Sequence, residues 1–232
     1  MRKTHKCSLA ALYVCLVSGL MTAWTARAEV NFVTDSLASG TGPRAPGSTL
    51  NGVTTETGGK TWTLYSDNAG GVKFATNPTQ GVYESPDGNV SAYVPITWAP
   101  GDVINLSAEL LVVPGSQWER FGFSATNTQH IQPQDTAMSL DVSSYLPLVW
   151  HTVNLKLDTG TRQLSNSVDG SLVWTTTLTA PQVASIHYAG FQFYAQVVGG
   201  NYGGARNFQI IPEPATLALL GLGGLTLLRR RR

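Results

Sequence analysis

The chain has 232 residues, of which 42% are hydrophobic and 12% charged, and its formal net charge at pH 7 is +1. That total hides an uneven distribution, because eight of the fifteen basic residues lie near the two ends. Residues 29–211 carry seven basic and thirteen acidic side chains, a net charge of about −6. A region of this charge lacks the basic patch that nucleic acid or an anionic membrane surface would need, so we expect neither as a partner of it.

The first 28 residues have the organisation of a secretory signal peptide. A basic start is followed by a mostly apolar stretch over 8–21, which predicts a signal helix. Small residues then stand at Ala26 and Ala28, the two positions that a signal peptidase reads. We therefore expect residues 1–28 to be removed by cleavage before Glu29. The alternative is a retained N-terminal membrane helix.

Both cysteines of the chain, Cys7 and Cys15, lie inside this predicted signal peptide. The exported part then has neither a disulfide framework nor a thiolate metal site. It must be held together by its core alone, and residues 29–211 are long enough for one domain of ordinary size.

Three features follow one another at the C-terminus. Pro212, Glu213 and Pro214 precede an uncharged apolar run over 215–228, and a basic block ends the chain. At about 1.5 Å per residue the run spans roughly 21 Å, which is shorter than the ~30 Å hydrocarbon core of a bilayer. We expect a short transmembrane helix that holds the chain transiently, with the basic block on the cytoplasmic side. The basic block consists of Arg229, Arg230, Arg231 and Arg232.

Taken in this order, the three features resemble the PEP-CTERM sorting signal of Gram-negative bacteria, which we place at 211–232. The resemblance implies export by the general secretory route, transient retention in the inner membrane and recognition by an exosortase. It further implies cleavage near the Pro-Glu-Pro and a final place at the cell surface or outside the cell. Proteins with this signal accompany exopolysaccharide and biofilm matrix.

Residues 29–210 show a recurring alternation of apolar and polar side chains and no sustained helical period. In 106–112, 153–157 and 191–197, for example, every second residue is apolar, so each segment can turn one face to a core and the other to water. Asp-Gly and Asp-Thr-Gly sequences suited to hairpin turns separate several such segments. The pattern predicts an all-β domain, an antiparallel two-sheet sandwich of about ten to twelve strands.

The most specific part of this region is 150–178, which reads as strand, Asp-Thr-Gly turn, strand, Asp-Gly turn and strand. Together with the Gly-rich opening over 35–63, it resembles the concanavalin-like jelly roll of laminin-G-like and legume-lectin-like domains. The resemblance implies that the closing strand, at 206–210, lies beside the N-terminal one. An immunoglobulin-like sandwich would share much of the pattern.

The acidic residues do not have the arrangement of a glycosidase, which needs two carboxylates on either side of the scissile bond. Glucanases of the concanavalin-like fold carry a Glu-x-Asp-x-Glu run, and this chain has none. The closest pairs are Glu84 with Asp87, in a Pro-containing turn, and Glu109 with Glu119. Glu109 stands on the polar side of an alternating segment, where a solvated charge is the ordinary role. We expect no enzymatic activity.

The three histidines between 29 and 211 stand in no metal-ligand spacing, and the chain has no Gly-x-Ser-x-Gly sequence. His130 is expected to be exposed in a polar loop, whereas His151 and His187 take strand positions beside core residues. We expect no cofactor and assign no metal ligand. Calcium stays open, because loop carboxylates and amides suit it; the loop residues concerned are Asp67, Asn68, Asp87, Asp135 and Asp169.

Sugar binding depends on an aromatic ring that stacks on a pyranose, flanked by amide and hydroxyl groups. Trp118, beside a Gly-Ser-Gln turn, is the tryptophan of this region that we expect to be exposed, since most of the others are expected in the core. Gln192, Tyr194 and Gln196 share the polar face of one alternating segment. We predict these four residues as ligand contacts.

The leading interpretation is a non-enzymatic exported protein of the cell surface or extracellular matrix, with exopolysaccharide as its candidate ligand. Signal peptidase and an exosortase are the expected partners during export. Two alternatives stay open, a glycan-active enzyme on a jelly-roll fold and a purely structural matrix protein.

Overall fold

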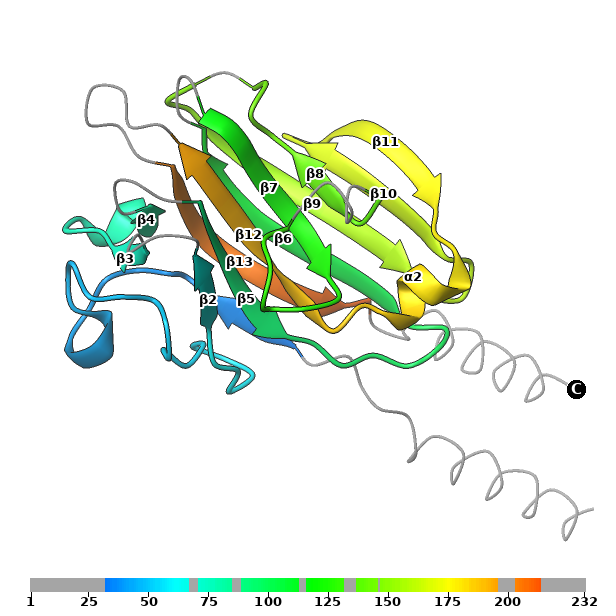
Figure 1. Cartoon of the computed structure of the whole chain (residues 1–232), viewed down its shortest axis with the longest axis horizontal. Helices are drawn as coiled ribbons and strands as arrows, with labels where there is room; N and C mark the ends of the chain where they lie inside the picture. The colour runs from blue at the N-terminus through cyan, green and yellow to red at the C-terminus, as the bar shows by residue number, and fades with distance from the viewer. Residues whose placement is uncertain are drawn as a thin grey trace, which may run out of the picture.

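The computed structural model describes residues 32–66, 71–84, 89–112, 116–131, 137–145, 147–195 and 203–213, and these form two antiparallel sheets packed face to face (Figure 1). The larger sheet contains β1 (Val33–Asp35), β3 (Val72–Phe74), β4 (Val82–Glu84), β6 (Val103–Leu111), β9 (Trp150–Asp158), β10 (Gln163–Val168), β11 (Ser171–Thr177) and β13 (Gly204–Pro212). The smaller sheet contains β2 (Thr63–Ser66), β5 (Val90–Pro95), β7 (Ser116–Ser124), β8 (Ser139–Asp141) and β12 (Tyr188–Ala195).

The strand order is β11-β10-β9-β6-β13-β4-β3 in the large sheet, where β1 also pairs with β13. It is β2-β5-β12-β7-β8 in the small sheet. Neighbours in these orders are often distant in sequence, so most of the pairing is long-range. The prediction of an all-β, two-sheet antiparallel sandwich is confirmed. The two helices expected to flank it, within 1–28 and 215–228, lie outside the described residues.

The segment 150–178 folds as its turn sequences predict, into the consecutive strands β9, β10 and β11. At the first turn the Asp158 carboxylate accepts backbone hydrogen bonds from Gly160 and Thr161, each 2.9 Å long. At the second turn Asp169 and Gly170 both have positive φ angles, of 50° and 78°. Asp and Gly tolerate that backbone region, which is why this dipeptide specifies a tight hairpin.

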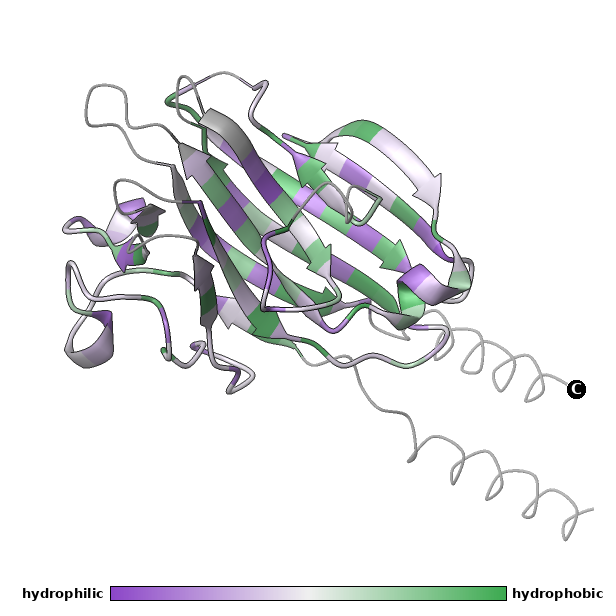
Figure 2. Ribbon diagram, in the orientation of Figure 1, coloured by the Kyte–Doolittle hydropathy of each residue, from purple (hydrophilic) through white to green (hydrophobic). Residues whose placement is uncertain are grey.

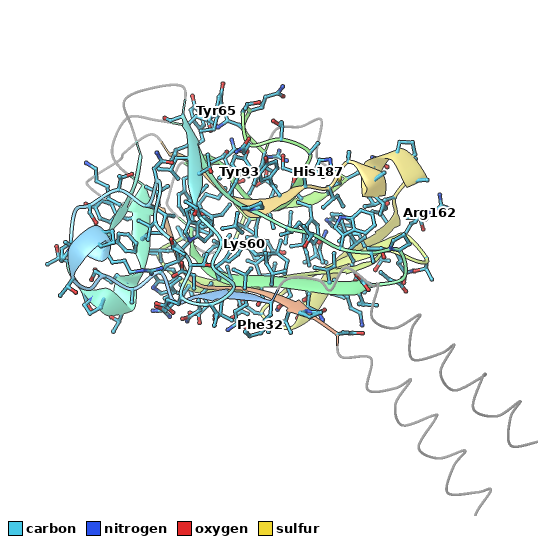
Figure 3. All side chains as sticks on the ribbon, turned by 90° about the horizontal axis from the view of Figure 1, so that it is seen from below. Phe32, Lys60, Tyr65, Tyr93, Arg162 and His187 are labelled. Atoms are coloured by element: carbon cyan, nitrogen blue, oxygen red, sulfur yellow. The ribbon has the colours of Figure 1, made fainter. Side chains whose placement is uncertain are left out.

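The core lies between the two sheets and follows the predicted alternation on the large sheet. Buried and less buried residues alternate along the whole of β6 and β9, and Figure 2 shows the same alternation of hydropathy along the strands. Aromatic rings fill the centre, where Trp62 packs against Phe191 and Phe208 at centroid distances of 5.5 and 4.9 Å. In the edge-on view of Figure 3, side chains fill the space between the sheets.

The small sheet departs from the prediction, because both faces of β5 are buried. The alternation over 90–94 predicts that Ser91 and Tyr93 face water, but the loop over 125–131 contacts both of them. The Tyr93 hydroxyl donates to the carbonyl of Gln129, and Ser91 Oγ lies 3.2 Å from His130 Nδ1. His130 is therefore 3% exposed, and the expectation of an exposed histidine is wrong. The alternation of one strand cannot reveal a loop that folds over it.

The two ends of the domain lie side by side, as the resemblance implied. In the register of β1 and β13, Val33 is opposite Ile210 and Asp35 is opposite Phe208. β13 continues through Ile211 to Pro212, two residues past the expected end of the domain at 210. The last strand and the Pro-Glu-Pro sequence therefore overlap.

Three short helical turns complete the described part of the chain: η1 (Gly42–Arg44), η2 (Pro78–Gln80) and α2 (Ala180–Ala184). No helix was predicted at α2, since five residues are too few for a visible period of 3.6. Its sequence nevertheless carries a capping box, in which Thr179 and Gln182 exchange side chain to backbone hydrogen bonds. None of the helices in the described ranges has the length and hydropathy of a membrane span.

Candidate functional site

Two of the four predicted ligand contacts, Gln192 and Tyr194, lie on the outer side of the small sheet. Tyr194 on β12 is directly opposite Trp118 on β7, and Gln192 lies two residues away on the same side. Tyr194 is half-buried. The side chain of Trp118 and the whole of Gln196 lie outside the described part. The structure thus brings the backbones of Trp118, Gln192 and Tyr194 together, whereas the alternation had predicted a shared face only for Gln192, Tyr194 and Gln196.

Gln192 does not have the solvent-exposed position that the sequence suggested. It is 1% exposed, and its Nε2 donates a 2.7 Å hydrogen bond to Asn89 Oδ1. Gln192 is opposite Ser91 of β5, which His130 and Ile131 of the 125–131 loop contact. In this conformation the Gln192 amide positions Asn89 and is not presented to solvent.

A second polar group, which the sequence reading missed, occupies the outer side of the large sheet. Arg206 on β13 forms a salt bridge with Glu109 on β6, with Nε 2.7 Å and a terminal nitrogen 2.6 Å from Oε2. Asn207 Nδ2 donates a 2.8 Å hydrogen bond to the other carboxylate oxygen of Glu109. The second terminal nitrogen of Arg206 donates to the carbonyl of Thr79, at 2.8 Å. The guanidinium, the carboxylate and the amide are therefore held in fixed positions.

These side chains adjoin a cavity of about 220 Å³ that opens to solvent. Arg206 and Asn207 form one wall, and η2 forms another. The full lining is Ser36, Ala38, Pro78, Thr79, Arg206 and Asn207. The hydrogen bonds above use one N–H of each terminal guanidinium nitrogen and one N–H of the Asn207 amide. Each terminal guanidinium nitrogen and the Asn207 amide nitrogen has a second N–H that none of the described contacts uses. These N–H groups and the Asn207 amide oxygen are therefore available to a ligand.

A bulge in β13 creates this arrangement. The register against β6 shifts between Arg206 and Gln209, and Asn207 has a positive φ of 55°. Its backbone N–H donates 3.1 Å to the carbonyl of Ser36, which joins the bulge to the segment after β1. Asn tolerates a left-handed backbone better than other side chains, so Asn207 suits the position. Simple alternation carries no signal for a bulge, and so the residues were not identified from the sequence.

Trp150 stands next to this group on β9. The Arg206 guanidinium carbon lies 4.2 Å from the centroid of the Trp150 ring, a close cation–π contact. The alternation over 150–157 predicts Trp150 on the side opposite Val153 and Leu155, and the burial pattern of β9 agrees. The stacked ring holds the guanidinium, so Trp150 supports the cavity wall and does not itself line the cavity.

Asp35 fixes the opposite wall of the cavity. It is almost fully buried and accepts two 2.8 Å hydrogen bonds from Arg44, one from Trp62 Nε1 at 2.9 Å and one from the Leu37 backbone at 2.8 Å. The hydrogen bonds to Asp35 raise the pKa of Arg44 further, so the guanidinium stays charged. Ser36 lies between Asp35 and Leu37 and donates backbone and side-chain hydrogen bonds to Glu56. The wall that carries Ser36 is therefore rigidly placed.

The residues weighed for catalysis do not converge in the described part of the chain. Glu109 lies on the outer side of the large sheet, whereas Glu119 belongs to β7 of the small sheet and is fully buried. The side chain of Glu84 and all of Asp87 are outside the described residues.

The histidines have ordinary structural positions. His151 is buried, and its Nδ1 donates a 2.7 Å hydrogen bond to Asp169, whose pKa this bond lowers. His187 is exposed just before β12. Of the residues considered for calcium, only Asp169 is described, and no group of three acidic, histidine or cysteine side chains gathers within the described ranges. The others, Asp67, Asn68, Asp87 and Asp135, lie outside them.

The predicted sorting residues are described only in part. Pro212 ends β13, and the Glu213 backbone N–H donates 2.9 Å to the carbonyl of Val103. The remaining predicted residues lie outside the described ranges, namely Ala26, Ala28, Pro214, Arg229, Arg230, Arg231 and Arg232.

Comparison with known proteins identifies the C-terminal motif. Residues 211–232 match the PEP-CTERM protein-sorting motif. The chain is thus an exported protein with a sorting signal that an exosortase processes, and the predicted bounds 211–232 are confirmed. A search of curated proteins found no match.

Several solved structures are similar to the sandwich at low identity. Arcelin-5, a lectin-like defence protein from Phaseolus vulgaris, is 8% identical with a TM-score of 0.49, over 80% of this chain and 99% of that one. The carbohydrate recognition domain of Emp46p is 11% identical with a TM-score of 0.44, over 64% and 87%. A sialidase is 14% identical with a TM-score of 0.42 over 65% of this chain, which spans only 17% of the sialidase.

Proposed function

We propose that the exported sandwich is a non-enzymatic protein of the cell surface or extracellular matrix that binds polysaccharide in the cavity beside Arg206 and Asn207. The observation that carries this proposal is the rigid polar wall of that cavity. Arg206 and Asn207 are both held by Glu109 and line the cavity, yet each has hydrogen-bonding groups that none of the described contacts uses. Groups held in place before binding lose little entropy when they bind.

The size and chemistry of the cavity suit one ring or one chain end of a sugar polymer. At about 220 Å³ it is smaller than the ~300–1,000 Å³ of pockets for drug-sized ligands. Pro78 and Ala38 supply apolar surface, and the guanidinium and the amide supply donors and an acceptor. The Ser36 hydroxyl donates its hydrogen to Glu56, so it can serve a ligand only as an acceptor. Many weak contacts of this kind along one polymer would add up through multivalency.

Binding is better supported than hydrolysis. Glycoside hydrolysis requires two carboxylates on either side of the scissile bond, about 5–10 Å apart. Glu109 is the carboxylate next to the cavity, and it is already bound by Arg206 and Asn207. Glu119, its nearest candidate partner in sequence, belongs to the other sheet and faces the core.

The experiment uses the purified chain in nanodiscs, tested against a glycan array and against the exopolysaccharide of its own host. The variant N207G removes the amide and keeps a residue that tolerates the positive φ, so it should fold normally. N154A, on the outer side of β9, is the matched control. We expect saturable binding that N207G weakens at least about tenfold and N154A leaves unchanged, which corresponds to one lost polar contact.

Two other results would redirect the assignment. Loss of binding in Y194A with full binding in N207G would move the site to the small sheet, where Trp118 and Tyr194 are neighbours. Absence of binding to every glycan would contradict the proposal and leave a structural matrix role.

A further inference from the structure

The sorting motif begins inside the folded domain. Residues 211–232 match the motif, yet Ile211 and Pro212 are the last two residues of β13. Ile211 is opposite Asn105 and Pro212 opposite Ile104 in the register with β6. The backbone N–H of Glu213 then donates to the carbonyl of Val103 at 2.9 Å. Pro212 is therefore part of the large sheet, and Glu213 is hydrogen-bonded to it.

The side chain of Glu213 is held as well. Its carboxylate contacts the ammonium group of Lys156, and the two side chains are 41% and 50% exposed. Lys156 lies on β9, opposite Asn105 of β6, which in turn is opposite Ile211. The lysine therefore reaches across β6 to the end of β13. Lys156 of β9, Asn105 of β6 and Ile211 of β13 are thus cross-strand neighbours, and Glu213 follows Ile211 by two residues.

This attachment leaves almost no chain between the sheet and the apolar run. Only Pro214 separates Glu213 from Ala215, where the run begins. One residue extends at most about 3.6 Å, so no linker can carry the Pro-Glu-Pro away from the sheet. An enzyme can bind such a sequence in extended form by pairing with one edge of it, and the edge of Ile211 and Pro212 that faces β6 is already occupied.

We propose that Lys156 and the start of β6 form a latch that sequesters Glu213, so that processing of the sorting motif requires the end of β13 to open. The partner is the membrane enzyme that cleaves near this motif, and it competes with Lys156 for the glutamate. The latch is weak, because the end of β13 has to open before the motif can be processed. Pro212 has no N–H to donate to β6, and the ion pair is exposed to solvent.

The first test follows processing of the full-length chain by pulse-chase in cells that contain the processing enzyme. K156Q removes the charge that holds Glu213 and leaves the motif intact. We expect it to speed processing about two- to fivefold, the range set by an exposed ion pair. The control is K73Q, a lysine on β3 at the far edge of the same sheet. An unchanged or slower rate in K156Q would overturn the proposal.

The second test locks the strand end. In N105C/I211C the cysteines replace directly opposite residues of β6 and β13, next to the Pro-Glu-Pro but outside it. We expect the oxidised chain to be processed at least about tenfold more slowly than the same chain after reduction, because a covalent link prevents opening. Equal rates before and after reduction would show that the motif is cleaved with β13 in place. Neither assay involves a glycan, so both are independent of the proposed function.

Discussion

Asp35 accepts hydrogen bonds from a guanidinium, an indole and a backbone amide, which come from different parts of the N-terminal third of the chain. Such a carboxylate is stable in the core only while its partners remain. Its sequence neighbourhood gave no sign of this role, because Asp35, Arg44 and Trp62 are brought together by loops. Their pairing is a property of the folded chain and not of any local pattern.

The variant R44M should therefore destabilise the protein markedly. It removes the bidentate partner and leaves the buried carboxylate with its indole and amide donors alone. Breaking such a pair costs about 3 kcal/mol of unfolding free energy, measured by urea denaturation. R162M, in the exposed turn before β10, serves as control and should change stability by less than about 0.5 kcal/mol. A loss of the same small size in R44M would show that the Asp35 cluster does not stabilise the domain.

Asp158 and Asp169 make stability depend on pH. Backbone hydrogen bonds from Thr161 lower the pKa of Asp158, and the hydrogen bond from His151 lowers that of Asp169. A carboxylate with a lowered folded-state pKa stabilises the protein above its unfolded pKa, here about 3.8, and loses that effect as the pH falls below it. The unfolding free energy should thus decline as the pH drops from 5 towards 2.

The isosteric variant D169N tests the contribution of Asp169. Asn also tolerates the positive φ at this position, so the turn should persist. D169N should be less stable than the wild type at pH 6, and the difference should shrink as the pH approaches 2. Chemical denaturation at several pH values measures both quantities. A difference that stays constant over this range would contradict the role assigned to the carboxylate charge.

At the scale of elements, Gly190 shows how closely the strands of the small sheet approach one another. A Cβ at Gly190 would lie 1.8 Å from the carbonyl oxygen of Ala92 on β5. That oxygen belongs to the backbone, so it could move away only if the strand itself shifted. G190A should lower the unfolding free energy by at least about 2 kcal/mol. G71A is the matched control, since the nearest atom there would be 4.0 Å away. Equal thermal stability of the two variants would contradict the described packing of β5 on β12.

The elements that the sequence predicted best are those with strong turn chemistry. The Asp158 and Asp169 turns define β9, β10 and β11 within a few residues, because their backbone requirements are local. β5 and Gln192 were misjudged because a loop covers them, and α2 was missed because it is short. The bulge at Asn207, which builds the cavity, needs contacts from Ser36 and β6 that no local pattern encodes.

At the scale of the whole molecule, alternation predicted the two-sheet sandwich but could not give the strand order. The pairing of β13 with β1 joins residues more than 170 positions apart, and its pairing with β6 joins residues about a hundred positions apart. The C-terminal motif, in contrast, was recognised from sequence with its bounds, because it is read as a linear signal. The site combines both cases: Gln192 and Tyr194 were predicted on one side of one strand, whereas the contacts of Arg206 and Asn207 with Glu109 emerge only from the fold.

Hydrogen–deuterium exchange of the chain, with and without saturating host exopolysaccharide, would show directly whether polysaccharide binds in the cavity on the large sheet. We predict slower exchange on binding in 36–38, 78–80 and 206–208, the segments that line the cavity. Exchange in β12 should be unchanged. Protection confined to the segments around Trp118 and Tyr194, or no protection anywhere, would contradict the account.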